Sequence, residues 1–359
     1  MFPGCYIQGT DVIEQLGSAL SRFGERGLSV MAPSAFSLLK DRLEGQSSNV
    51  ELFIEEFNRE CCDAEIEQLA NIGRERQAQF IIAIGGGKTI DTGKIVADRL
   101  NVPVAVVPTI ASTDAPCSAC AVVYSEEGVV TRIEYQKKNP DLVLVDSGII
   151  ANAPVRFLIA GMGDALATWF EAESCQKTKS NNAAGELGSI TAYALARLCY
   201  DTLLEYGVAA ITSCRANAVT PALEHVIEAN TLLSGLGFES GGLATAHSIH
   251  NGLTVLPQTH NYYHGEKVAM GVLSSLFLTG KSKSQIDEVY SFCESVGLPT
   301  TLAEIGLTDI SLDDLWKVAS QACIAGESIH HEAGEITPQM VVYAMQAANG
   351  EGKRRKNIL

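Results

Sequence analysis

Apolar residues follow two different rhythms along the chain, and the change between them predicts two structural halves. In residues 1–150, short β-branched runs alternate with amphipathic stretches. The runs expected to form strands are Gly27–Met31, Phe80–Ile84, Val104–Val107 and Leu142–Asp146, and the expected helices are Asp63–Gln77 and Thr89–Leu100. Strand, helix, strand in this order predicts parallel βαβ units.

After Pro154 the pattern changes to long Ala- and Leu-rich stretches with helical periodicity. These expected helices are Phe157–Cys175, Ala183–Leu204, Pro221–Gly237, Lys267–Leu278 and Leu312–Ala325. We find no strand-like alternation of comparable quality in this half. The sequence therefore predicts an α/β, Rossmann-like parallel-sheet domain over residues 1–155, followed by an all-α domain over residues 156–359.

The composition is typical of a compact globular enzyme. The chain has 359 residues, of which 46% are apolar and 19% charged, and a formal net charge of −16 that argues against nucleic-acid binding. It has no apolar run of the ~18 residues that a membrane span needs, and no secretory signal pattern. We therefore expect a cytoplasmic protein without nucleic-acid or membrane partners. Its cysteines are expected to be free thiols, and its basic run Lys353–Lys356 a solvated tail.

A glycine-rich turn, Gly85–Gly87, follows the expected strand at 80–84 and enters the next expected helix. Glycines let the backbone approach a ligand closely, and the start of the helix offers N–H groups and a positive dipole end to a phosphate. We expect a pyrophosphate here, with a plain tight turn as the alternative because the spacing fits neither standard fingerprint. The loop Pro108–Ser118 follows the next strand. Its hydroxyls could hold a ribose or phosphate and Asp114 a substrate hydroxyl, although such loops are often only turns.

A carboxylate and several histidines in the second half predict a metal site. Asp164 lies in an expected helix, and His247, His250 and His264 belong to a stretch, 225–264, that holds most of the seven histidines. One carboxylate with two imidazoles is typical of a catalytic zinc site whose fourth position stays open for water or substrate. The spacing leaves open whether His247 pairs with His250 or with His264, and purely structural histidines are the alternative.

Five motifs resemble those of the glycerol dehydrogenases, which belong to the metal-dependent ("iron-containing") alcohol dehydrogenase superfamily. They are Gly85–Asp91, Pro108–Pro116, Gly163–Ala172, Gly237–Gly242 and His264–Val268. The resemblance extends from about Tyr6 to Thr337. It implies an NAD(P)-dependent oxidoreductase of polyol metabolism that works as a homo-oligomer.

The resemblance also implies roles for individual residues. Asp164, His247 and His264 correspond to zinc ligands, and Thr168 replaces a fourth ligand, a histidine, of the iron-using relatives, which favours zinc. Asp114 corresponds to a catalytic carboxylate that contacts glycerol, and His247 would lie beside the substrate as well as the metal. His250 is a candidate proton relay, with a structural histidine as the alternative. The implied nucleotide contacts are Gly86, Gly87, Lys88, Thr89, Ile90, Asp91, Thr109, Ser112, Ser118, Cys120 and Tyr124.

One position departs from the pattern of the family. Its members usually carry an acidic residue after the second strand, where it accepts hydrogen bonds from the adenosine ribose. This chain has Pro33 at or beside that site, so no carboxylate holds the ribose or repels a 2′-phosphate. We therefore expect NAD as the cofactor, with measurable use of NADP.

Residues and resemblance together predict zinc-dependent oxidation of glycerol, or of a similar short vicinal polyol, to a hydroxyketone (from glycerol, dihydroxyacetone). Zinc lowers the pKa of a bound hydroxyl, and hydride passes to the nicotinamide. One alternative is another small 2-hydroxy compound dehydrogenase of the same family. Two further alternatives are an NAD- and zinc-dependent lyase of the dehydroquinate synthase type and a non-catalytic sensor of a metal or a nucleotide. The lyase's phosphorylated substrate would need several Lys or Arg, and no such cluster flanks the metal motifs.

Overall fold

The computed structural model describes residues 1–46, 50–126 and 128–357. The chain forms two compact units. The first comprises Met1–Val155 with Ser213–Gly235, and the second comprises Arg156–Thr212 with Leu236–Leu359.

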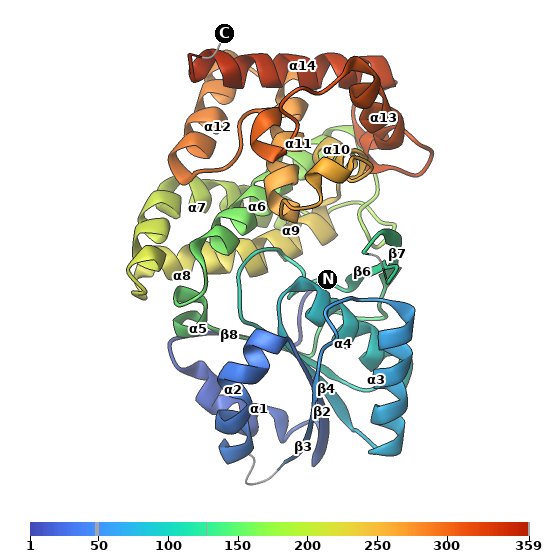
Figure 1. Cartoon of the computed structure of the whole chain (residues 1–359), viewed down its shortest axis with the longest axis vertical. Coiled ribbons are helices and arrows are strands. Elements are labelled where there is room, and N and C mark those ends of the chain that lie inside the picture. The colour runs from blue at the N-terminus through green and yellow to red at the C-terminus, as the bar shows by residue number, and fades with distance from the viewer. Residues whose placement is uncertain (47–49, 127, 358–359) are drawn as a thin grey trace. The chain divides into compact units, whose positions relative to one another are not determined.

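A six-stranded parallel sheet forms the centre of the first unit (Figure 1). In spatial order its strands are β1 (Tyr6–Gly9), β8 (Leu142–Asp146), β5 (Val104–Pro108), β4 (Phe80–Gly85), β2 (Arg26–Met31) and β3 (Glu51–Glu56). The four expected strands, β2, β4, β5 and β8, are confirmed. The edge strands β1 and β3 escape the sequence pattern because their side chains are only partly buried and mix polar with apolar residues.

Helices cover both faces of this sheet (Figure 1). One face carries α1 (Leu16–Leu20) and α2 (Pro33–Gln46), and the other carries α3 (Asp63–Glu75) and α4 (Gly87–Leu100). Leu39 of α2 belongs to a buried cluster with Ile82 of β4, whereas Gly93 of α4 packs directly on Ala83. Successive side chains of a strand point to opposite faces, so one strand supports both helix layers.

Smaller elements complete the first unit. They are the 3-10 turn η1 (Val12–Gln15), α5 (Ser147–Ala151) and an antiparallel hairpin of β6 (Cys120–Tyr124) and β7 (Val130–Tyr135). The hairpin directly follows the loop that begins after β5.

The segment 213–235 belongs to the sheet unit, whereas the sequence pattern groups it with the all-α half. It contains α8 (Pro221–Glu228) and a π-helix, η2 (Ala229–Leu233). Gln8 Nε2 of β1 donates to Glu224 Oε2 at 2.6 Å, and Tyr6 OH lies 3.0 Å from Thr231 Oγ1. Helical periodicity carries no sign of such contacts, so the local pattern could not assign this segment to the sheet.

The second unit is helical, and together with the parallel sheet it confirms the expected fold class. Its helices are α6 (Val155–Thr178), α7 (Ile190–Arg215), α9 (Ser234–Gly241), α10 (Thr245–Leu253), α11 (His264–Leu278), α12 (Lys283–Val296), α13 (Leu312–Ala322) and α14 (Pro338–Arg355), with 3-10 turns η3 (Pro257–Thr259), η4 (Leu302–Ile305) and η5 (Ser328–His331). Helix α7 begins later than the expected Ala183 because a β-bridge between Asn181 and Leu187 closes a turn there.

The basic run Lys353–Lys356 is not a solvated tail as expected. Lys353–Arg355 form the end of α14 and Lys356 is its C-cap residue. The half-buried Arg355 bonds to Glu294, with 2.8 Å between Nε and Oε1. Lys356 Nζ lies 2.7 Å from Glu304 Oε1. Cations near the end of a helix also interact favourably with its dipole. The run therefore fastens α14 to neighbouring elements of its own unit.

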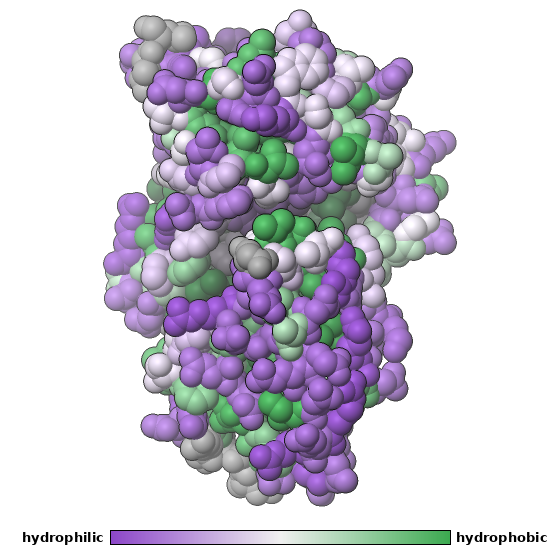
Figure 2. Space-filling view, turned by 45° about the vertical axis from the view of Figure 1, so that its right-hand side comes forward, coloured by the Kyte–Doolittle hydropathy of each residue, from purple (hydrophilic) through white to green (hydrophobic). Residues whose placement is uncertain are grey.

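Within the described residues, no helix is both long and apolar enough to cross a membrane. On the face drawn in Figure 2, hydrophilic residues cover most of the first unit, the lower part of that view, with hydrophobic ones scattered among them. In the part of the chain that the structure describes, no cysteine takes part in a disulfide.

Candidate active site

Helix α6 carries two buried carboxylates on one face. Asp164 and Glu171 are seven residues apart, about two helical turns, and only 1% and 2% exposed. Next to Asp164, a side chain at Gly163 would come within 2.9 Å of the carbonyl carbon of Gly265. Glycines at these two positions therefore let α6 and the start of α11 approach closely enough for Asp164 to meet His264.

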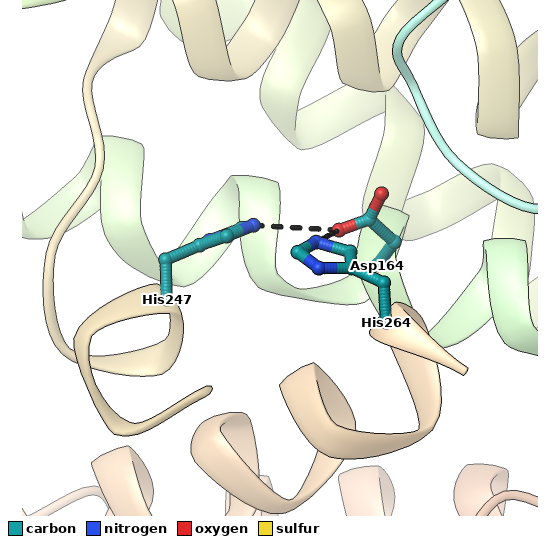
Figure 3. A group of neighbouring side chains, drawn as sticks. All are labelled: Asp164, His247 and His264. Atoms are coloured by element: carbon teal, nitrogen blue, oxygen red, sulfur yellow. Dashed lines mark ion pairs between the residues drawn. The ribbon is translucent and has the colours of Figure 1, made fainter. Parts of the chain in front are cut away.

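Two histidines reach Asp164 from the first turns of two other helices (Figure 3). His247 lies in the first turn of α10, and His264 is the first residue of α11. The start of α11 is fixed by a capping box, in which Tyr263 N donates to Glu266 Oε2 at 2.8 Å. Arg156 in turn holds Glu266, with 2.7 Å between Nε and Oε1. These bonds set the direction in which His264 leaves the helix.

The three side chains have the spacing of a metal-binding group. Their ligand atoms lie within 4.8 Å of one another. The Nε2 atoms of His247 and His264 lie 3.4 and 3.0 Å from Asp164 Oδ1. Tetrahedral zinc with bonds of about 2.0–2.1 Å places neighbouring ligand atoms about 3.3–3.4 Å apart. One carboxylate oxygen and two imidazole nitrogens at these distances therefore fit a zinc-sized ion.

The charges around this group favour a cation. Burial alone would raise the pKa of Asp164, but the charges and hydrogen bonds of His264 and His247 hold that pKa well below its usual range. Burial alone would lower the pKa of His247, but Glu171 and Asp164 raise it well above the ordinary value. The buried carboxylate of Asp164 thus lies where positive partners stabilise its charged form.

His250 and Thr168, both singled out in the sequence, lie beside the group rather than in it. His250 Nε2 is 3.0 Å from His264 Nδ1, and His250 Nδ1 is 3.1 Å from Asn251 Oδ1. Burial lowers the pKa of His250 well below its ordinary value, which keeps this imidazole neutral. Thr168 lies one turn after Asp164 and packs on Gly237. Of the two histidine pairs left open by the spacing, the structure brings His247 and His264 to Asp164.

The glycine-rich turn joins β4 to α4 as expected. The N-cap residue of α4 is Gly86, which makes no side-chain cap hydrogen bond. A Cβ at Gly85 would come within 2.7 Å of Ala32 Cβ, and one at Gly86 within 2.9 Å of Ile110 Cδ1. Glycine at these two positions therefore allows close packing at the start of α4.

Several of the expected nucleotide contacts also have partners inside the first unit. Asp91 Oδ2 accepts from Val122 N at 3.0 Å, and its Oδ1 lies 2.9 Å from the Lys94 ammonium. Lys88 Nζ bonds to Glu60 Oε2 at 2.7 Å and lies 4.5 Å from the ring centroid of Tyr124. Asp91 and Lys88 therefore shape this region by contacts within the protein.

Lys94, missed in the sequence, is almost completely buried in α4. Its ammonium donates to the carbonyl oxygens of Ala115 at 3.0 Å and of Cys120. It therefore ties the loop after β5 to the helix that begins at the glycine turn. A lysine three residues after Asp91 could have been recognised as an intrahelical ion pair, but its burial could not.

Asp114 lies in the loop after β5 and has a partner that the sequence analysis missed. Ser234 Oγ donates to Asp114 Oδ2 at 2.8 Å. Ser234 is buried and begins α9 immediately after the π-helix η2. A π-helix shifts the side chains that follow it and is frequent at functional sites. Here it precedes the serine that orients the carboxylate.

Comparisons with known proteins identify the family to which this fold and this candidate metal-binding group belong. Residues 3–147 match the family model described as iron-containing alcohol dehydrogenase. Over 359 residues the chain is 57% identical to a glycerol dehydrogenase of Thermotoga maritima. This match covers 100% of the chain and 98% of the relative. It is 47% identical to a glycerol dehydrogenase of Escherichia coli, over 98% of this chain and 96% of that protein.

A solved structure agrees with these relatives. The crystal structure of a probable glycerol dehydrogenase from Sinorhizobium meliloti 1021 has a TM-score of 0.94 and 42% identity, covering 98% of both chains. The chain belongs to the glycerol dehydrogenase group of the iron-containing alcohol dehydrogenase family. It is therefore an oxidoreductase that acts on an alcohol or polyol.

Proposed function

We propose that this enzyme is a zinc-dependent glycerol dehydrogenase, which oxidises glycerol or a similar short vicinal polyol to a hydroxyketone with hydride transfer to NAD(P). The observation that carries the proposal is the Asp164, His247 and His264 group. Its two imidazoles and one carboxylate match zinc better than the oxygen-rich sets typical of magnesium or calcium. The relatives named glycerol dehydrogenase support the substrate.

In this proposal each residue has a separate task. Asp164 Oδ1 and the Nε2 atoms of His247 and His264 hold the zinc ion. A bound zinc ion supplies Lewis-acid polarisation of the substrate hydroxyl. Asp114, oriented by Ser234, accepts a hydrogen bond from the neighbouring hydroxyl of a polyol. His250 Nε2 accepts the Nδ1 proton of His264, which orients that ligand and allows His250 to serve as a proton relay.

The nucleotide would bind at the start of α4, with its pyrophosphate on the N–H groups that follow Gly86. Pro33 is the first residue of α2, directly after β2 and Ala32. The next two cations after Pro33 in the sequence are already engaged: Lys40 lies over the Phe36 ring, and Arg42 pairs with Glu14. We therefore expect NAD to be modestly preferred, with measurable use of NADP. A homo-oligomer in the cytoplasm is part of the same proposal.

A metal-removal experiment combined with a substrate panel tests this function. The isolated enzyme is expected to contain about one zinc ion per chain, to lose activity on chelation and to regain it with zinc. Glycerol and 1,2-diols should be oxidised faster than 2-hydroxy acids with NAD. His264→Ala should lose nearly all turnover and most of its zinc, because two ligands rarely retain the ion. Full activity of demonstrably metal-free enzyme would overturn the proposal.

A further inference from the structure

Glu171 receives three hydrogen bonds from one short stretch of the second unit. Its Oε1 accepts from Ala244 N at 3.0 Å and from His247 N at 2.9 Å. Its Oε2 lies 2.6 Å from His247 Nδ1. The side chain is 2% exposed, so water does not compete for these bonds. A single carboxylate thus contacts both the backbone and the imidazole of a candidate metal ligand.

The backbone bonds cap helix α10. Its N-cap residue is Ala244, which has no side chain able to cap, and His247 is its third residue. The first N–H groups of a helix need partners outside the helix, and a side-chain oxygen of the N-cap residue normally supplies one. Here Glu171 Oε1 supplies it from α6. The carboxylate therefore fixes where α10 begins, and with it the position of the His247 backbone.

The side-chain bond selects the form of the imidazole. Carboxylate oxygens accept hydrogen bonds, and Glu171 Oε2 lies 2.6 Å from His247 Nδ1, so we assign the proton between them to Nδ1. In the neutral ring the lone pair then lies on Nε2, the atom 3.4 Å from Asp164 Oδ1. A second carboxylate behind a ligating histidine is a recurrent way to fix its tautomer and direction.

We propose that Glu171 is the positioning residue of the metal centre, which sets both the start of α10 and the Nε2 lone pair of His247 through its two oxygens. This inference rests on the proposed function in taking Asp164, His247 and His264 as ligands. Because Asp164 and Glu171 share a face of α6, one rigid helix places a ligand and the group that orients another ligand.

Two substitutions separate the capping of α10 from the orientation of the His247 imidazole. In Glu171→Gln the amide oxygen can still accept from Ala244 N and His247 N, but the amide NH2 faces His247 Nδ1. The imidazole must then carry its proton on Nε2, where it blocks the metal. Glu171→Ala removes both tasks. Glu173→Gln is the matched control, since Glu173 lies on the same helix and pairs instead with Lys177 and Lys281.

The experiment measures zinc affinity by chelator competition, Co²⁺ absorption as a report of site geometry, and amide hydrogen exchange at 244–248 in metal-free protein. We expect Glu171→Gln to lose 10- to 100-fold in zinc affinity, with an altered Co²⁺ spectrum and near-normal exchange. Glu171→Ala should lose affinity and also exchange faster, and Glu173→Gln should match the wild type.

Zinc affinity of Glu171→Gln within about twofold of the wild type would overturn the proposal, because a merely space-filling carboxyl tolerates the amide. Unchanged exchange in Glu171→Ala would overturn the capping role. If the wild type itself bound neither metal, the proposed function would fail instead. The exchange result, obtained without metal, would still decide whether Glu171 anchors α10.

Discussion

At the scale of single residues, the site depends on pairs in which one side chain orients another. Ser234 orients Asp114, His250 lies behind His264, and Glu171 lies behind His247. Each orienting bond is buried or partly buried, where a polar group without a partner is costly. Each residue proposed to contact the metal or the substrate is therefore oriented by a second residue from a different part of the chain.

A substitution at Asp114 tests the proposed substrate contact. Asp114→Ala should lower kcat/KM for glycerol and 1,2-diols by about 10- to 100-fold, because a hydrogen bond to a charged group contributes about 1.5–3 kcal/mol. Monohydric alcohols lack the second hydroxyl and should change little. Steady-state kinetics on both substrate classes make the comparison, and Ser234→Ala should give the same selectivity in weaker form. An equal loss for all alcohols would assign Asp114 to the cofactor or to the fold.

At the scale of elements, the carboxyl ends of the strands determine where nucleotide-binding groups can lie. Met31 at the end of β2 is paired with Ile84 near the end of β4. The turn after each strand therefore lies at the same edge of the sheet, and a cofactor that meets the start of α4 extends toward Pro33. We therefore propose that cofactor choice is decided at this boundary, the first residue of α2.

Pro33→Asp tests this assignment. The new carboxylate should accept hydrogen bonds from the ribose and repel a 2′-phosphate, so kcat/KM for NAD should rise by roughly tenfold while use of NADP falls. Aspartate also suits the first turn of a helix, so α2 should tolerate it. The comparison is kcat/KM for both cofactors in both proteins. A wild type that already rejects NADP by ~1000-fold, about 4 kcal/mol, would show that another group selects the cofactor.

At the scale of the whole molecule, the residues expected to contact the nucleotide and those expected to hold the metal belong to different units. The expected nucleotide contacts, from Gly86 to Tyr124, all lie in the first unit, whereas Asp164, His247 and His264 all lie in the second. Each ligand should therefore stabilise mainly the unit that holds it, since ligand binding stabilises the part of the fold that forms its site.

Hydrogen exchange with each ligand added separately tests this division. Zinc at about 100 times its Kd adds roughly 2.7 kcal/mol to the free energy of unfolding. It should therefore slow amide hydrogen exchange in α6, α10 and α11 by up to about 100-fold. NAD should instead slow exchange in α4 and the 108–120 loop. Zinc added to His264→Ala is the control and should protect nothing. Equal protection of both units by zinc alone would contradict the assignment of its ligands to the second unit.

The sequence by itself determined the parts of the structure that depend on consecutive residues. Short, mostly apolar runs mark β2, β4, β5 and β8 because central parallel strands are buried on both faces. The glycine turn before α4 is visible because its packing demands glycine at adjacent positions. The resemblance to the family likewise marks Asp164, His247 and His264 as candidate ligands.

The tertiary structure decided what depends on residues far apart in the chain. It brought His247 and His264 together at Asp164, placed Glu171 behind His247 and attached the helical segment 213–235 to the sheet. It also buried Lys94 under the loop after β5 and fastened the basic end of α14. Spacing and periodicity report only on neighbours within a helix or strand, whereas these contacts arise when separate elements pack together.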